Sequence, residues 1–145
     1  MKEVLTPQEA KKIFDAANEK YFEGKLKPIP IKSMSSGRVA SYSYQKEKGK
    51  IVRRVIFVSS VHKIEKDLFE STVVHEMLHY YLHLKYGKDM GHNKIWEKTI
   101  AEYNQKYGLH ITTKPDPSVV EYIGDTITAA IHRWLLRQVK RLVHR

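Results

Sequence analysis

The sequence of 145 residues contains no cysteine. A disulfide framework, a cysteine zinc ribbon and a thiol nucleophile are therefore excluded. No stretch approaches the roughly eighteen apolar residues of a transmembrane helix, and the N-terminal segment MKEVLTPQEAKK lacks the apolar core of a secretory signal peptide. We therefore expect a protein that is not secreted and has no membrane span, located in the cytoplasm, at the nucleoid, or in the nucleus of a eukaryote.

Acidic residues are fewer than basic ones, and the chain carries a formal net charge of +10. The excess is concentrated in two blocks. Residues 25–54 hold nine Lys or Arg and one acidic residue, and residues 126–145 hold five Lys or Arg and no acidic residue. A basic block can be a plain solvated surface, but two blocks of this asymmetry favour an anionic partner, most simply nucleic acid.

The most informative motif is His75-Glu76-Met77-Leu78-His79, which has the form H-E-x-x-H. On a helix, residues four apart lie on one face, so the imidazoles of His75 and His79 can converge on one metal ion. The carboxylate of Glu76 can then reach a water molecule at that ion. This is the arrangement of zinc metalloproteases. The apolar residues on both sides of the motif argue against the alternative, a surface helix that carries two histidines by chance.

A catalytic zinc ion usually takes three protein ligands, so a third ligand is needed. His83 lies on the same helix face, but it is about 12 Å from His75 along the axis, too far for two Zn–N bonds of about 2.0–2.1 Å. His92 follows Gly87 and Gly91, which allow the chain to turn back over the metal, and we predict it as the third ligand. Zn²⁺ is the expected ion, although Mn²⁺ and Co²⁺ bind similar sites.

Hydrophobic periodicity and turn residues predict a single α+β domain. The strands are expected to form a small three-stranded antiparallel sheet. The predicted elements are a helix from Thr6 to Gly24, strands at 31–34, 39–44 and 51–58, an active-site helix that starts between Ile64 and Asp67 and ends near Tyr86, a helix from about 93 to 107, and a basic C-terminal helix from about Ser118.

The basic blocks supply candidate nucleic-acid contacts. In the first block, Tyr42 and Tyr44 share one face of their strand and could stack on bases, or be ordinary aromatics on a sheet surface. In the second block, apolar residues at helical spacing oppose basic ones. This pattern fits a helix that meets phosphates, an interfacial membrane helix, or a solvated surface. The candidate contacts are Arg38, Arg53, Arg54, Arg133, Arg137, Lys140 and Arg141.

The H-E-x-x-H motif, followed by Gly91-His92 and an aromatic residue at Trp96, resembles the SprT-like family, which includes Spartan-type nuclear proteases of DNA–protein crosslinks. The segment Tyr21–Leu26 resembles the family's aromatic-x-Gly-x-Leu segment, and the resemblance spans about residues 10–108. Asn93 departs from it by replacing a small residue. The cysteine zinc ribbon that follows the protease core in many members has no counterpart here.

The resemblance implies a zincin-like fold, with His75, His79 and His92 as zinc ligands and Glu76 as the general base. It implies DNA-stimulated proteolysis of DNA-bound proteins. We therefore expect protein substrates and DNA, single-stranded or with junctions, as partners. Residues 1–113 are expected to form the SprT-like metalloprotease domain, and residues 114–145 a basic helical extension packed on it.

Two other functions compete with this prediction. One is a regulatory intracellular zincin that cleaves a specific repressor, for which DNA would be irrelevant. The other is a non-enzymatic nucleic-acid-binding protein with a structural zinc ion. Glu76 argues against the second, because a structural metal site needs no general base.

Overall fold

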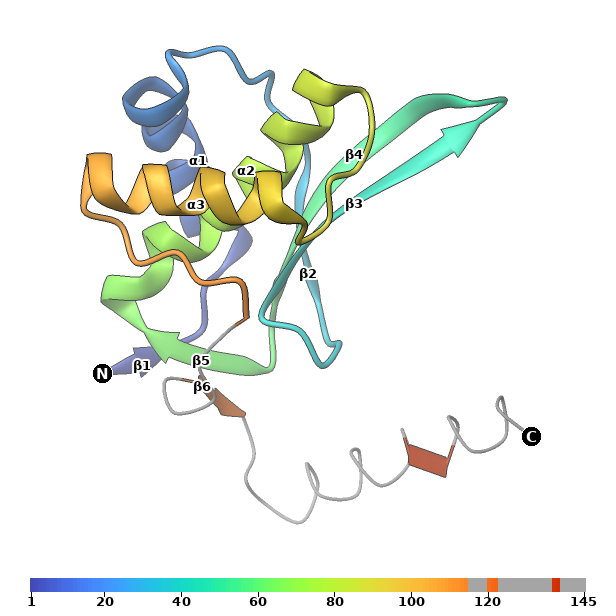
Figure 1. Cartoon of the computed structure of the whole chain (residues 1–145). Coiled ribbons are helices and arrows are strands. Elements are labelled where there is room, and N and C mark those ends of the chain that lie inside the picture. The colour runs from blue at the N-terminus through green and yellow to red at the C-terminus, as the bar shows by residue number, and fades with distance from the viewer. Residues whose placement is uncertain (115–119, 123–136, 139–145) are drawn as a thin grey trace.

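The computed structural model of the chain describes residues 1–114, 120–122 and 137–138 (Figure 1). The predicted α+β class is confirmed: an N-terminal helix precedes a small sheet, and two further helices follow it. In chain order, the elements are β1 (Lys2–Glu3), α1 (Pro7–Phe22), β2 (Ile31–Met34), β3 (Ala40–Glu47), β4 (Lys50–Ser59), β5 (His62–Glu65), the 3-10 helix η1 (Lys66–Leu68), α2 (Phe69–Tyr86), α3 (Lys94–Tyr107) and β6 (Val120–Tyr122).

The main sheet has three strands in the order β2-β4-β3. The hairpin β3–β4 is antiparallel, as predicted, whereas β2 runs parallel to β4 with Ile31 opposite Ile56. The prediction of an all-antiparallel sheet is therefore corrected at the pair β2–β4, which is parallel. β4 contains the apolar run 55–58 and takes the central position, where it can be buried between two neighbours. The shorter, more polar β2 lies at the edge, and the loop 35–39 carries the chain across to β3.

A second sheet, which the sequence analysis did not anticipate, has the order β1-β5-β6. The central strand β5 is antiparallel to both neighbours. We expected residues 120–122 at the start of the C-terminal helix, but Val120 and Tyr122 suit a strand and pair with β5. Most of the rest of the predicted C-terminal helix, with Arg133, Lys140 and Arg141, lies outside the described residues. Arg137, which is described, is exposed.

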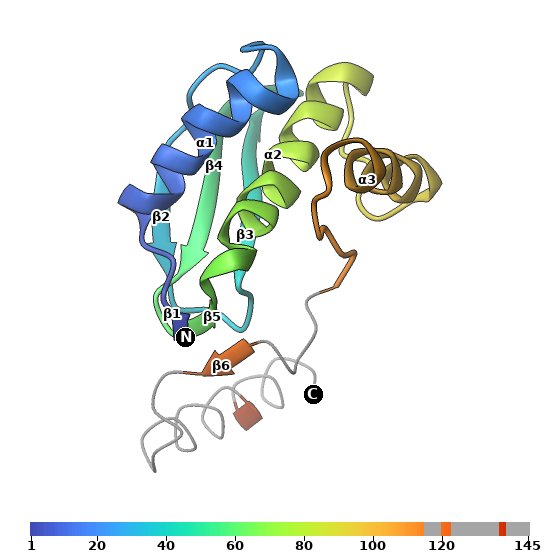
Figure 2. The ribbon, with the colours of Figure 1, turned by 90° about the vertical axis from the view of Figure 1, so that its left-hand side faces the viewer.

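Helix α2 lies at the centre of the molecule. Figure 2 shows α1 and α2 side by side on one face of the main sheet, with α3 on the far side of α2. Val73, Val74, Met77 and Leu78 of α2 are each at most 1% exposed. The motif that the sequence places on α2 is therefore held by a helix packed on several sides.

No helix among the described residues is long and apolar enough to cross a membrane.

Candidate metal centre

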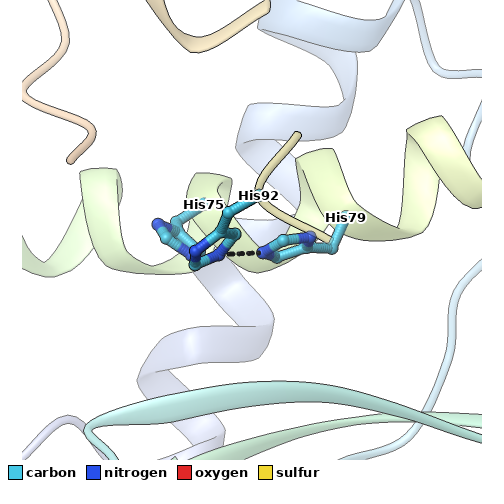
Figure 3. A group of neighbouring side chains, drawn as sticks. All are labelled: His75, His79 and His92. Carbon is cyan, nitrogen blue, oxygen red and sulfur yellow. Dashed lines mark hydrogen bonds between the residues drawn. The ribbon is translucent and has the colours of Figure 1, made fainter. Parts of the chain in front are cut away.

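Three histidine side chains meet beside α2 (Figure 3). His75 and His79 lie one turn apart on α2, and His92 reaches them from the loop between α2 and α3. Their potential ligand nitrogens all lie within 4.8 Å of one another, and the Nε2 atoms of His79 and His92 are 3.2 Å apart. The structure thus brings together the three residues that the sequence analysis selected, and His83 is not among them.

The loop that carries His92 begins and ends with defined caps. Gly87 ends α2 with a left-handed φ of 72°, and Gly91 has a φ of 54°. Glycine adopts such angles without a steric penalty. Asn93 then caps α3, because its side-chain oxygen accepts a hydrogen bond from the backbone N–H of Trp96 at 3.0 Å. The family resemblance leads us to expect a small residue at position 93. Asn93 departs from that pattern, but it has a structural role as the cap of α3.

The indole of Trp96 is fully buried and forms a platform beneath the three imidazoles. Its ring lies parallel to that of His79, with the centroids 3.9 Å apart and an interplanar angle of 4°. It is also 4.8 Å from the ring of His75 and 5.2 Å from that of His92. A flat, rigid side chain in contact with all three imidazoles restricts their rotation and keeps them convergent.

The electrostatics of the histidines fit a cation site. The pKa of His75 is lowered to about 3 and that of His79 to about 4. Burial is the main cause, and repulsion from neighbouring histidines is the second. Both rings are therefore neutral at pH 7, and neutral imidazole is the form that binds a metal ion. This donor set of three imidazoles matches catalytic zinc sites with three protein ligands.

His75 has a further partner that sequence reasoning missed. Its ring forms a hydrogen bond with the backbone of Thr112, in the extended segment after α3. A histidine that binds a metal commonly donates its other N–H to a carbonyl, which fixes the tautomer and the ring orientation. Since the partner is a backbone group, no residue type at position 112 could have signalled it.

Glu76 lies next to the histidines and is more buried than they are. The residue is 5% exposed, and the Oε1 atom of its carboxyl group is 3.6 Å from Nε2 of His75. Burial raises the pKa of Glu76 to about 8, while a hydrogen bond from the backbone of Tyr42 and the charge of Arg38 lower it. A bound cation would lower the pKa further, because an opposite charge favours the carboxylate.

The comparison with protein families agrees with this geometry. The model of the SprT-like family matches residues 10–115, more than half of the chain. The chain belongs to the SprT-like family. The resemblance drawn from the sequence is thereby confirmed, and membership indicates a function of the metalloprotease type. A search of curated proteins found no match.

In this SprT-like chain the three histidines open onto a groove of about 1080 Å³. Residues 37–42, from the β2–β3 loop and the start of β3, line part of it, and residues 110–114 line another part. Among the described strands, β3 lies at the edge of the main sheet, so an extended chain in the groove would lie beside this edge. His110 also lines the groove.

Among the described residues, the predicted nucleic-acid contacts are not gathered in one place. Arg38 lines the groove, and Arg53 is exposed on β4. Arg54 is turned into the domain: its guanidinium hydrogen-bonds the hydroxyl of Tyr42, lies 3.0 Å from Nδ1 of His83 and stacks over the ring of Tyr80. The partners of Arg54 make it a structural cation of the SprT-like domain rather than a free phosphate contact.

Proposed function

We propose that this chain is a zinc-dependent protease that hydrolyses peptide bonds. His75, His79 and His92 would hold one Zn²⁺, and Glu76 would act as the general base. The observation that carries the proposal is the convergence of three imidazoles beside the buried side chain of Glu76, in a groove large enough for a peptide. A purely structural zinc site would need neither the carboxylate nor the groove.

The residues of the chain have distinct parts in this reaction. When bound, Zn²⁺ would polarise the scissile carbonyl and lower the pKa of the attacking water. Glu76 takes a proton from that water and passes it to the leaving nitrogen. Burial raises its pKa and a bound cation would lower it, and a general base works best with a pKa near the operating pH. Trp96 and the backbone of Thr112 hold the imidazoles in their orientation, and the edge of β3 can align an extended substrate.

We further propose that the substrates are proteins bound or crosslinked to DNA, and that DNA stimulates their cleavage. Support comes from the basic block 25–54, which includes β3 and the first half of β4 in the β3–β4 hairpin. Figure 1 shows this hairpin projecting from the body of the domain. Lys46, Lys48 and Lys50 are exposed near its turn, and Arg53 is exposed farther along β4. The hairpin can therefore reach a phosphate backbone, single-stranded or at a junction, without covering the groove.

The test is proteolysis of a basic DNA-binding protein by the zinc-loaded chain, with and without single-stranded DNA, and with Glu76→Gln as the inactive control. We expect cleavage that requires both DNA and Glu76. Cleavage that does not depend on DNA would still support a zinc protease, but it would favour a regulatory protease with a specific protein substrate. If zinc is bound and no protein is cleaved, a nucleic-acid-binding protein with a structural zinc ion becomes the better explanation.

A further inference from the structure

His92 is held differently from the other two histidines of the metal centre. His75 and His79 are fixed by α2, whose side chains are packed on several sides. His92 is exposed and lies in the loop 87–93, which has left-handed glycines at Gly87 and Gly91. Glycine lets the backbone adopt this shape, but it also leaves the backbone more freedom than any other residue. The position of His92 therefore depends on the contacts that restrain its loop.

Asp89 provides the restraint at the centre of the loop. Its Oδ1 atom accepts a hydrogen bond from the backbone N–H of Gly91 at 2.9 Å, which fixes the turn immediately before His92. Its Oδ2 atom accepts a hydrogen bond from the hydroxyl of Tyr44 at 3.2 Å. Among the residues that the structure describes, this bond is the side-chain hydrogen bond that joins the loop to the main sheet.

Tyr44 is itself anchored and can act as a fixed point. Its ring packs against the ring of His83, with centroids 4.5 Å apart, and against that of Tyr42 at 5.9 Å. Arg54 bonds to both of these neighbours from β4. Strand β3, strand β4 and helix α2 thus fix the tyrosine hydroxyl in a frame that does not include the loop.

We propose that Tyr44 and Asp89 are positioning residues for His92, the third metal ligand. The chain of contacts runs from the β3–β4 hairpin through the Tyr44 hydroxyl to Asp89, and from Asp89 through the Gly91 N–H to the backbone that carries His92. The inference rests on the proposed metal site. It adds that the geometry of this site depends on Tyr44 in the β3–β4 hairpin, which is far from the three histidines in the sequence.

The test measures the dissociation constant of Zn²⁺ from the full chain by competition with a chromogenic chelator. Tyr44→Phe removes one hydroxyl and should weaken zinc binding about tenfold, as for other outer partners of metal ligands. Asp89→Ala removes both bonds and should weaken it at least as much. Asp89→Asn keeps an oxygen for Gly91 and a polar partner for Tyr44, so it should retain most of the affinity. Tyr86→Phe, at an exposed tyrosine of α2, is the matched control and should bind zinc normally.

A double-mutant cycle separates positioning from general damage. If the two residues act through His92, Tyr44→Phe should leave zinc affinity unchanged in a His92→Ala background. An equal loss in both backgrounds would overturn the inference, and so would wild-type affinity in Tyr44→Phe. If Asp89→Asn loses as much zinc affinity as Asp89→Ala, the charge of Asp89 is responsible rather than its hydrogen bonds, and this result would also overturn the inference. Failure of the wild-type chain to bind zinc would instead overturn the proposed metal site.

Discussion

Helix α2 and the β3–β4 hairpin are in contact, yet they have opposite character. Ten of the 18 residues of α2 are buried, and they include Glu76. Residues 45–50, around the turn of the hairpin, are all exposed. The two elements meet where the ring of Tyr42 on β3 stacks on that of Tyr80 on α2, with centroids 5.8 Å apart.

This difference separates the two tasks of the proposed protease. A buried helix holds side chains in fixed orientations, which hydrolysis needs, and its dry surroundings shift the pKa values of His75 and Glu76 away from their values in water. The exposed, charged turn of the hairpin, residues 45–50, can contact a partner without disturbing that site. Changes in α2 should therefore alter chemistry or stability, and changes in this turn should alter binding.

The largest effect is expected from Glu76→Gln on α2. The amide cannot accept a proton from water, so the rate of peptide hydrolysis should fall by about a thousandfold or more. Zinc binding should persist, because the three histidines are unchanged. Hydrolysis is measured with a quenched-fluorescence peptide and zinc by metal analysis of the purified protein. The matched control is Glu97→Gln, at an exposed glutamate of α3. Full activity in Glu76→Gln would show that another group is the base.

A second comparison concerns stability. Leu82 of α2 is 2% exposed, and Val52 of the hairpin is 52% exposed. Leu82→Ala should lower the free energy of unfolding by about 2–5 kcal/mol, because it leaves a cavity in the core. Val52→Ala should change it by less than about 0.5 kcal/mol. Urea unfolding followed by circular dichroism measures both. Similar losses would mean that the hairpin is as much a part of the core as α2.

A third prediction tests the hairpin as a binding surface. The triple variant Lys46→Gln, Lys48→Gln and Lys50→Gln should weaken binding of single-stranded DNA and reduce the slope of log affinity against log salt by about 2, or about 0.7 for each lost phosphate contact. DNA-independent peptide hydrolysis should not change. Fluorescence anisotropy at several salt concentrations measures the slope. The control removes the same charge from three exposed lysines of α1, namely Lys11, Lys12 and Lys20.

An unchanged slope in the hairpin variant, or an equal loss in the α1 control, would remove the hairpin from the DNA-binding surface. In the first case the C-terminal basic block, which includes Arg133, Arg137, Lys140 and Arg141, would become the next candidate to test.

The same two regions show what the sequence can and cannot predict. His75, Glu76 and His79 follow from local spacing on one helix, and the turn at Gly87 and Gly91 suffices to bring back His92. These are short-range relations. The parallel pairing of β2 with β4 and the bond between Thr112 and His75 join segments far apart in the chain, and backbone groups of any residue can make them.

Arg54 illustrates a related difficulty. Its charge and its neighbours in the sequence made it a candidate for phosphate contact, but the alternation of side chains along β4 places it on the inner face of the sheet. Arg53, the next residue, is on the outer face and stays exposed. A shift of one residue in a strand decides between a packed and an exposed side chain, and the amino-acid composition does not show that shift.

The smallest effect is expected at His83, where α2 meets the hairpin. Burial lowers the pKa of His83, the charges of Arg54 and Lys46 lower it as well, and Asp89 opposes them. A histidine with a lowered pKa in the folded state binds its proton more readily when unfolded. Its contribution to stability is therefore complete above its unfolded pKa of about 6.5 and is lost as the pH falls below that value.

His83→Gln cannot titrate in this range, so its free energy of unfolding should fall less steeply than that of the wild-type chain between pH 6.5 and pH 5. Urea unfolding at both pH values, on metal-free protein, gives the two slopes. The other histidines are common to both proteins, and the difference between the slopes isolates His83. Equal slopes would mean that His83 takes up its proton in the folded state as easily as in water. The contact between α2 and the hairpin would then be open to solvent, and the hairpin less firmly fixed to the active-site helix than its stacking on Tyr80 indicates.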